Sequence, residues 1–478
     1  MPESFKTLCF YCGLLLLAIP ALPQDTLSAK ALPLPVTVTG YAPGAEGKRV
    51  RITTSGDGLT NMEKVLTSAG VEANGRFSAT FNLPRTTEVI FAIQFHTAGV
   101  YLEPGEKYDL RIAPMNYDDY SDKDPFLQSQ NLTLELLHTH TESVNSLIAR
   151  FDSLYDSFLL DNFNALYRER KKNRVDSLHA LLDREFPVRK NPYFDAYVRY
   201  KVASLEQLSQ YYNPAILAAK YLSAKPVLFW NREYMDFFNN YFTKYITVTS
   251  IPLHKIDFKP LLTGNQPVKN MLNALSSDTI LDTGPLREMA LLKGLLEFYS
   301  LPGYDRPAIL EALKTLHEQS QFEGTREVAG NCILYLERLQ PGSTAPEFSL
   351  TDRNGKELTL NDFKGKPLLL CFWTTWCTEC LTEMDLLVPL YEKYKEQINF
   401  LSVSADKYLS KMVLFIDLKK EYTWNFANLG DRLETLLDYE IRSYPFFVLI
   451  DSRGRIFRYP AAAPGGGLEH QIVQLLHE

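Results

Sequence analysis

Two cysteines three positions apart are the residues of this 478-residue chain that most directly suggest chemistry. Cys377 and Cys380 follow a continuous apolar run at 368–373 and begin a stretch of helical periodicity that continues over 381–395. Where a buried strand ends and a helix begins, the first cysteine lies beside unpaired backbone N–H groups and the positive end of the helix dipole. Both favour a thiolate, so this context predicts a reactive Cys377.

The spacing of the pair predicts thiol–disulfide exchange. Cys377 would attack as the nucleophile, and Cys380, one helical turn further on, would be the resolving cysteine that releases the mixed disulfide. A CxxC segment can also be half of a zinc site or a structural disulfide. Residues 341–478 contain no second CxxC and no His pair to complete a zinc site, and a disulfide that closes so short a loop contributes little stability. The sequence therefore implies neither a metal nor a cofactor.

The elements around the cysteines predict an α/β domain. Buried strands are expected at 368–373 and 399–404, and a strand, a turn and another strand at 446–456. Strands that alternate with helices form a mixed sheet covered by helices. A segment rich in glycine, proline and small polar residues at 340–346 precedes this domain, which is expected to span 341–478.

A β-rich module is expected at 33–115. Short runs of β-branched and aromatic residues alternate there with turn-forming glycines and prolines. The expected strands include 36–39, 49–53, 77–81 and 89–93. Strands of this length and spacing predict a small antiparallel β-sandwich. The module contains no cysteine, so we interpret it as a structural or docking module.

Between 124 and 339 the pattern changes to apolar residues that recur every three or four positions, which is typical of helices. The interpretation rests on Leu132, Leu134, Leu136, Leu137, Leu147, Phe151, Leu154 and Phe158. A central all-α region is therefore expected. The fold class predicted for the chain is multidomain, with a β-sandwich, an all-α region and a C-terminal α/β domain in that order.

The N-terminal residues have the layout of a secretory signal. Lys6 precedes an apolar run at 8–19, which small and turn-forming residues end at 20–24. The run is short for a bilayer span, so a signal peptide is expected at 1–24, with an uncleaved anchor as the alternative. Either one predicts an exported protein, periplasmic or associated with the cell envelope.

Charge and cysteine content restrict the function further. A net charge of −7 argues against a nucleic-acid partner, because binding phosphates requires a basic surface. Of the six cysteines, Cys9 and Cys12 fall in the expected signal. Cys332 and Cys371 then remain beside the CxxC pair, which is too few for a disulfide-stapled scaffold in an exported chain of this length.

Four motifs of the C-terminal domain, at 345–350, 352–356, 360–366 and 372–377, resemble the TlpA/ResA type of exported thioredoxin-like protein. The resemblance covers 341–478 and implies a thioredoxin fold with a redox-active centre. It also implies protein dithiols or disulfides as substrates, an upstream electron donor in the membrane or periplasm, and a role in cell redox homeostasis or antioxidant activity. The two preceding regions resemble N-terminal extensions of such proteins in Bacteroidota.

The resemblance also assigns supporting residues. Pro445 occupies the position of the family's cis-proline, which would place the backbone of Tyr444 against the CxxC segment, where it can pair with a substrate chain. Trp376 belongs to the motif that contains the first cysteine. Glu383 matches an acidic residue that tunes the active site in the ResA subgroup, and a solvated helix glutamate is the alternative interpretation.

Two residues depart from the patterns of related proteins. Thioredoxin has a buried aspartate six residues before its first cysteine, and Cys371 stands at that position here. We expect Cys371 to be a buried strand thiol, with a third redox thiol as the alternative. Glu379 lies between the two cysteines, where its negative charge would disfavour a thiolate, so a reducing couple is expected.

The sequence leaves three functions open. The first is an exported protein-disulfide reductase or isomerase that uses the CxxC dithiol. The second is a thioredoxin-fold peroxidase, because Thr374 and Cys377 form a Thr-x-x-Cys segment, although such sites need a proline where Leu370 stands. The third is a docking or scaffold protein with a vestigial redox domain.

Overall fold

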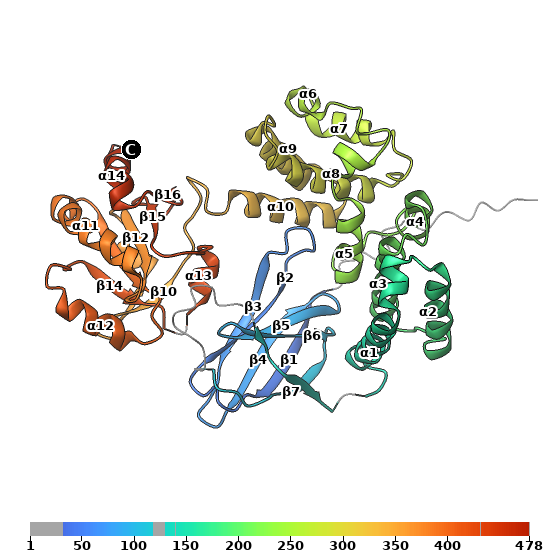
Figure 1. Cartoon of the computed structure of the whole chain (residues 1–478), viewed down its shortest axis with the longest axis horizontal. Coiled ribbons are helices and arrows are strands. Elements are labelled where there is room, and N and C mark those ends of the chain that lie inside the picture. The colour runs from blue at the N-terminus through green and yellow to red at the C-terminus, as the bar shows by residue number, and fades with distance from the viewer. Residues whose placement is uncertain (1–31, 118–129, 139, 431, 478) are drawn as a thin grey trace, which may run out of the picture. The chain divides into compact units, whose positions relative to one another are not determined.

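The computed structural model describes residues 32–117, 130–138, 140–430 and 432–477. The signal peptide expected at 1–24 lies outside the described residues. Along the chain, the described residues form a β-module of two sheets, a helical region and an α/β domain, which are blue, green to yellow, and orange to red in Figure 1. This succession confirms the predicted fold class.

The β-module consists of one sheet with the strand order β4-β1-β7-β9 and a second with the order β3-β2-β5-β6-β8. Its neighbouring strands are antiparallel except for two parallel pairs, β1 with β7 and β6 with β8. The strands are β1 Leu34–Tyr41, β2 Arg49–Ser55, β3 Glu63–Gly70, β4 Arg76–Leu83, β5 Thr87–Ile93, β6 His96–Leu102, β7 Lys107–Ile112, β8 Gln130–Asn131 and β9 Leu134–Leu137.

One hydrophobic core joins the two sheets, because alternate side chains of the strands point inward. Strand β4 shows this most clearly, with exposed residues between four buried ones, Phe77, Ala79, Phe81 and Leu83. They share the core with residues of the second sheet, such as Val50 of β2. The predicted sandwich is therefore confirmed, and the two parallel pairs are an addition to the antiparallel arrangement expected.

The helical interpretation of residues 132–137 is wrong. Leu134–Leu137 forms strand β9, which pairs antiparallel with β7, and the first helix begins only at Val144. The physical reason is that leucines two positions apart, such as Leu134 and Leu136, lie on one face of a strand. Both pack against the sandwich core, in which Leu132 is also buried.

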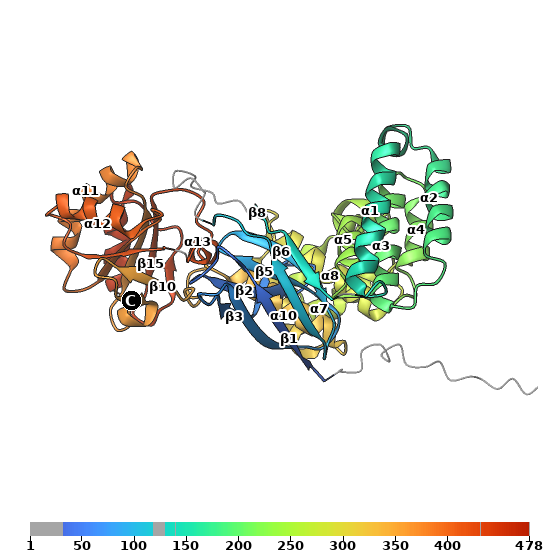
Figure 2. The same ribbon diagram turned by 90° about the horizontal axis from the view of Figure 1, so that it is seen from below.

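Helices follow one another between residues 144 and 337. Helices α1, α2 and α3 lie side by side in both views and share one core, and α3 to α10 surround a second (Figures 1 and 2). No helix in the described part of the chain combines the length and the apolar character needed to cross a membrane. The helices are α1 Val144–Phe163, η2 Asn164–Arg168, α2 Lys172–Glu185, α3 Pro192–Leu208, α4 Pro214–Tyr221, α5 Arg232–Tyr241, η3 Tyr245–Thr249, α6 Phe258–Thr263, α7 Pro267–Leu275, α8 Gly284–Tyr299, α9 Arg306–Gln319 and α10 Glu323–Glu337.

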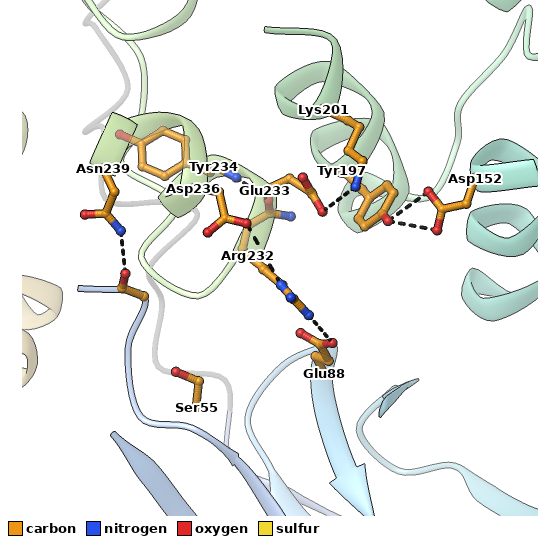
Figure 3. Close-up of polar contacts among 12 residues, drawn as sticks. Ser55, Glu88, Asp152, Tyr197, Lys201, Arg232, Glu233, Tyr234, Asp236 and Asn239 are labelled. Carbon is orange, nitrogen blue, oxygen red and sulfur yellow. Dashed lines mark hydrogen bonds and ion pairs between the residues drawn. The ribbon is translucent and has the colours of Figure 1, made fainter. Parts of the chain in front are cut away.

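Side chains of the β-module contact helix α5 (Figure 3). Arg232 at the start of α5 forms an ion pair with Glu88 of β5, with 2.8 Å between Nη1 and Oε1. Asn239 donates a hydrogen bond of 2.7 Å to the carbonyl oxygen of Gly58. A Cβ atom at Gly58 would lie 2.3 Å from the Cβ atom of Met235, so glycine is required for this close approach.

A buried glutamate and a half-buried aspartate lie near this contact (Figure 3). Glu233 is 7% exposed, and its Oε1 lies 3.3 Å from Nζ of Lys201. Burial raises the pKa of Glu233, and the Lys201 ammonium offsets only part of this effect. Burial likewise raises the pKa of Asp152, although Tyr197 donates a hydrogen bond of 2.9 Å to this carboxylate.

We expect the variant Glu233→Gln to become more stable relative to the wild type as the pH rises from about 4.5 to about 7. A carboxyl group with a raised pKa in the folded state contributes stability below its unfolded pKa, and this contribution is lost as the pH rises through the folded pKa. An amide does not titrate, so the variant escapes this loss, which amounts to about 1.4 kcal/mol for each unit of raised pKa. Urea unfolding at several pH values measures the difference.

The variant Glu318→Gln is the matched control, because Glu318 is an exposed glutamate of α9. The change with pH in the difference between variant and wild type should be larger for Glu233→Gln than for Glu318→Gln. A pH-independent difference for Glu233→Gln would contradict the prediction.

The described residues of the α/β domain form a seven-stranded sheet of order β11-β10-β14-β13-β12-β15-β16. Strands β12, β13 and β14 run parallel, and β15 lies antiparallel to β12. The strands are β10 Ser349–Asp352, β11 Glu357–Thr359, β12 Leu368–Trp373, β13 Asn399–Ser404, β14 Asn425–Asn428, β15 Phe446–Ile450 and β16 Ile456–Arg458. The helices are η4 Leu360–Phe363, α11 Thr378–Tyr394, α12 Leu409–Leu418, α13 Glu434–Asp438, η5 Pro464–Gly466 and α14 Leu468–Leu476.

Strand β12 is the central strand that positions the cysteines. It is buried at every position, because its side chains alternate between two cores on opposite faces of the sheet. Leu369, Cys371 and Trp373 face the core beneath α11, α12 and α14. The strands predicted at 368–373 and 399–404 coincide with β12 and β13. Their carboxyl ends meet at the edge of the sheet where the CxxC segment begins.

Candidate active site

Cys377 and Cys380 lie where β12 gives way to α11. Cys377 is the N-cap residue of α11, and its Sγ accepts a hydrogen bond of 3.1 Å from the backbone nitrogen of Cys380. The two cysteines form a disulfide with their Cα atoms 5.2 Å apart. Because the first N–H groups of a helix lack helical partners, the Cys377 sulfur occupies a position that stabilises negative charge.

The two cysteines differ in exposure. Cys377 is half-buried, whereas Cys380 is fully buried in the core beneath α11. Glu379 between them is exposed. A substrate disulfide can therefore reach the sulfur of Cys377 from solvent, while the sulfur of Cys380 is accessible only from within the domain.

An aromatic pair borders Cys377. The rings of Trp376 and Tyr444 lie edge to face, with their centroids 6.4 Å apart. Tyr444 and Cys377 pack against the same core, and the peptide bond between Tyr444 and Pro445 is cis. Tyr444 thus contacts Trp376, the residue directly before Cys377, and the cis peptide bond at Pro445 follows Tyr444 directly.

Glu383 lies one helical turn beyond Cys380 and is half-buried. Its Oε2 accepts a hydrogen bond of 2.9 Å from the backbone nitrogen of Gly465 in η5. A Cβ atom at Gly465 would lie 3.2 Å from the other carboxylate oxygen, so a glycine suits this contact. The glutamate therefore links α11 to η5.

The two remaining described cysteines are both buried. Cys371 lies within β12 and is 1% exposed, as expected from the sequence. Burial raises the pKa of its thiol, a hydrogen bond with Ser402 opposes this rise, and the charge of Glu383 adds to it. Burial also raises the pKa of Cys332, which is 0% exposed in α10. Neither thiol has the exposure or the thiolate character that rapid exchange requires.

After reduction of the disulfide, we expect an alkylating reagent to label Cys377 in the folded protein and to leave Cys371 and Cys332 unlabelled. The two buried thiols should react only after unfolding in guanidinium, because burial removes both access and thiolate. Mass mapping of peptides labelled before and after unfolding measures the difference. Labelling of folded Cys371 at the rate of Cys377 would contradict this and would make Cys371 a candidate third redox thiol.

Sequence reasoning overlooked the contacts of the turn that leads to Cys377. Thr375 in this turn donates hydrogen bonds to the carboxylate of Asp406, just after β13. A signal was present, because Asp406 comes two residues after the buried strand predicted at 399–404, and side chains that follow parallel strands meet at one edge of the sheet. The pairing itself depends on the order of strands in the sheet.

A mixed sheet with helices on both faces, and a cysteine pair at the N-terminus of the helix after the central strand, define a thioredoxin-like domain with a dithiol–disulfide site. Comparison with known proteins gives the same class. The family model described as AhpC/TSA family matches residues 341–458.

Two curated relatives and one solved structure illustrate the likeness. Thioredoxin-like protein YneN of Bacillus subtilis (strain 168) is 36% identical over 121 residues, which are 25% of this chain and 69% of the relative. Thiol-disulfide oxidoreductase ResA of the same strain is 31% identical over 142 residues, which are 29% of this chain and 78% of the relative. The crystal structure of the thioredoxin domain of a thiol-disulfide oxidoreductase from Bacteroides vulgatus is 28% identical, with a TM-score of 0.27, over 29% of this chain and 98% of that one.

Through its C-terminal domain, the chain belongs to the AhpC/TSA family and is a thioredoxin-like thiol–disulfide oxidoreductase related to ResA.

Proposed function

We propose that this protein reduces protein disulfides outside the cytoplasm through the dithiol form of Cys377 and Cys380. The observation that carries the proposal is the geometry of the pair, in which a half-buried sulfur at a helix N-terminus stands next to a fully buried one. An accessible thiolate can attack a substrate, and a protected second thiol can then resolve the product without being oxidised first.

The exchange proceeds in two steps. The Cys377 thiolate attacks one sulfur of a substrate disulfide, and the other substrate sulfur leaves as a thiolate that takes up a proton. Cys380 then loses its proton and attacks the Cys377 sulfur in the mixed disulfide, which releases the second substrate thiol. The substrate gains two electrons and two protons, and the protein is left as the disulfide. A dithiol donor in the membrane or periplasm must then reduce it again.

The neighbouring residues have roles that fit this reaction. The backbone at Tyr444 and Pro445 would pair with an extended substrate segment next to Cys377. Trp376, directly before Cys377, would limit the approach to the sulfur on one side. Glu383, held by η5 one turn beyond Cys380, would adjust the proton affinity of the pair.

We assign the direction of electron flow from the charges around Cys377. Glu379 is an exposed carboxylate between the two cysteines, and a negative charge there opposes a second one on the Cys377 sulfur. A less stable thiolate makes the reduced form a stronger reductant.

The location outside the cytoplasm rests on the apolar run at 8–19 and on the break that follows it. Cell fractionation tests this location, and recovery of the protein in the cytoplasm would overturn it.

The direct test mixes the chemically reduced protein, freed of reductant, with a protein disulfide such as that of insulin. We expect two substrate thiols to form for each protein molecule that is oxidised. Consumption of hydrogen peroxide, measured in parallel, should be no faster than with the Cys377→Ser variant. Rapid peroxide consumption without insulin reduction would favour the peroxidase alternative, and inactivity in both assays would favour a docking role.

A further inference from the structure

A buried carboxylate holds the turn that leads into the CxxC segment. Asp406 follows β13 and is 1% exposed. Its Oδ2 accepts a hydrogen bond of 3.0 Å from the backbone nitrogen of Thr375, and its Oδ1 accepts one of 2.8 Å from the Thr375 hydroxyl. Both bonds restrain Thr375, which stands two residues before Cys377 in the sequence.

The neighbouring strands hold Asp406 in its turn. The hydroxyl of Ser404, the last residue of β13, donates a hydrogen bond of 2.6 Å to Oδ2 of Asp406. The side-chain amide of Asn428, the last residue of β14, donates one of 2.7 Å to the backbone carbonyl of Asp406. The backbone nitrogen of Ala405 donates one of 2.8 Å to the carbonyl of Trp373, where β12 ends. The carboxyl ends of three parallel strands are thus joined around this aspartate.

A carboxylate is an unusual group with which to hold a turn in the interior. Burying a carboxylate costs free energy unless hydrogen bonds compensate for the lost hydration. Hydrogen bonds to a charged acceptor are shorter and stronger than hydrogen bonds between neutral groups. The three donors on the Asp406 carboxylate meet this requirement. The charge of Asp406 also acts near the cysteines. Burial is the main cause that raises the pKa of Tyr444, and the charge of Asp406 adds to this effect. The Tyr444 ring contacts Trp376, next to Cys377 in the sequence.

We propose that Asp406 is a positioning residue for thiol–disulfide exchange, which fixes Thr375 and thereby the direction in which Cys377 presents its sulfur to a substrate disulfide. The inference rests on Cys377 as the attacking thiol of the proposed function. It does not depend on which protein is the substrate, so a small disulfide can serve as the probe.

Two consequences are measurable. A loosened turn misplaces the sulfur, which slows exchange about tenfold to a hundredfold even when Cys377 is fully ionised. Loss of the carboxylate charge also lowers the pH at which Cys377 becomes a thiolate, because one negative charge no longer opposes another. The other titratable groups around the cysteines remain in the variants, namely Glu379 and Glu383 on α11, Lys407 after Asp406, Tyr444 before β15, and Cys380.

The experiment measures the reaction of the reduced full-length protein with 5,5′-dithiobis(2-nitrobenzoate) by stopped flow across a range of pH. The variants are Asp406→Asn, Thr375→Val and the conservative Thr375→Ser. Asp451→Asn is the matched control. Asp451 is also an aspartate that holds a turn. It accepts hydrogen bonds from the backbone nitrogens of Arg453 at 2.9 Å and Arg455 at 2.8 Å and from Nε of Arg455 at 2.9 Å, but it follows β15 at the end remote from Cys377.

For Asp406→Asn we expect a plateau rate at high pH at least about tenfold below that of the wild type and a midpoint at lower pH. Thr375→Val should show a smaller loss of rate, Thr375→Ser should match the wild type, and Asp451→Asn should change neither quantity. A residue that acted only on stability would leave the plateau rate of the folded variants unchanged, because Cys377 is fully ionised there.

A folded Asp406→Asn variant with the plateau rate and midpoint of the wild type would overturn this inference alone. If Asp406→Asn does not fold, Thr375→Val tests the inference instead. A plateau rate of Thr375→Val equal to that of Thr375→Ser would overturn the inference. A wild-type protein without a reactive thiol would instead overturn the proposed function and the inference with it.

Discussion

The variant Cys380→Ser should accumulate as covalent adducts in which Cys377 forms a disulfide with the proteins that it reduces. The first exchange remains possible because Cys377 is half-buried and accessible, but the sulfur that would resolve the adduct is absent. Adducts with proteins of a cell-envelope extract should appear on non-reducing electrophoresis and disappear on addition of reductant. Mass spectrometry of the adducts then identifies the substrates. The wild type should give few adducts, because Cys380 resolves them.

Two matched variants control this result. Cys377→Ser should give no adducts, and its reduction of insulin should fall to the uncatalysed rate, because the buried Cys380 cannot replace it. Cys371→Ala should reduce insulin at about the wild-type rate, since Cys371 is buried in β12. Adducts formed through Cys371 or Cys380 would contradict the assignment of Cys377 as the attacking thiol.

The variant Lys220→Met should lower the free energy of unfolding of the helical region by about 1 to 2 kcal/mol, less than for a fully buried ion pair, because the Lys220 side chain is 38% exposed. Lys220 lies 2.9 Å from the carboxylate of Glu206, which is 0% exposed and also lies 2.8 Å from Nε2 of His179. Burial alone would raise the pKa of Glu206, but the hydrogen bonds from His179 and Lys220 lower it overall. Removing Lys220 takes a cationic partner away from a buried carboxylate. Urea unfolding followed by circular dichroism measures the loss.

The double variant Glu206→Gln with Lys220→Met should recover most of the lost stability, because it removes the unpaired charge as well. Lys225→Met is the control, since Lys225 is an exposed lysine of the same segment, and its effect should stay within about 0.5 kcal/mol. If Lys220→Met is as stable as Lys225→Met, the ion pair with Glu206 does not hold these helices together.

The α/β domain could be predicted from the sequence because its signals are local. The apolar run of β12 predicts a strand that is buried on both faces, and Cys377 follows this strand at the start of a helix. The β-module was partly predictable for the same reason, through the alternation in strands such as β4. At 132–137 the spacing of the leucines led to a wrong prediction of helix, because short runs of leucine fit a helix as well as a strand. Pairing with β7 decided the outcome.

Contacts between distant segments could not be predicted. Glu383 meets Gly465 only because η5 folds against α11, and Asp406 meets Thr375 because β13 lies beside β12. The order of strands in a sheet is a property of the whole fold, and local patterns in a single sequence do not predict it. Gly58 shows the same limit, because its need for glycine arises from Met235, far along the chain in α5.

The reduction potential of the Cys377–Cys380 pair tests the central claim most directly. The purified protein is equilibrated in dithiol buffers of defined potential, and its reduced fraction is measured by alkylation and mass spectrometry, with Cys377→Ser as the control without a transition. We predict a reducing couple, nearer the potential of thioredoxin at about −270 mV than that of a strong dithiol oxidant at about −120 mV. A value close to about −120 mV would contradict the account and make the protein an oxidant of other proteins.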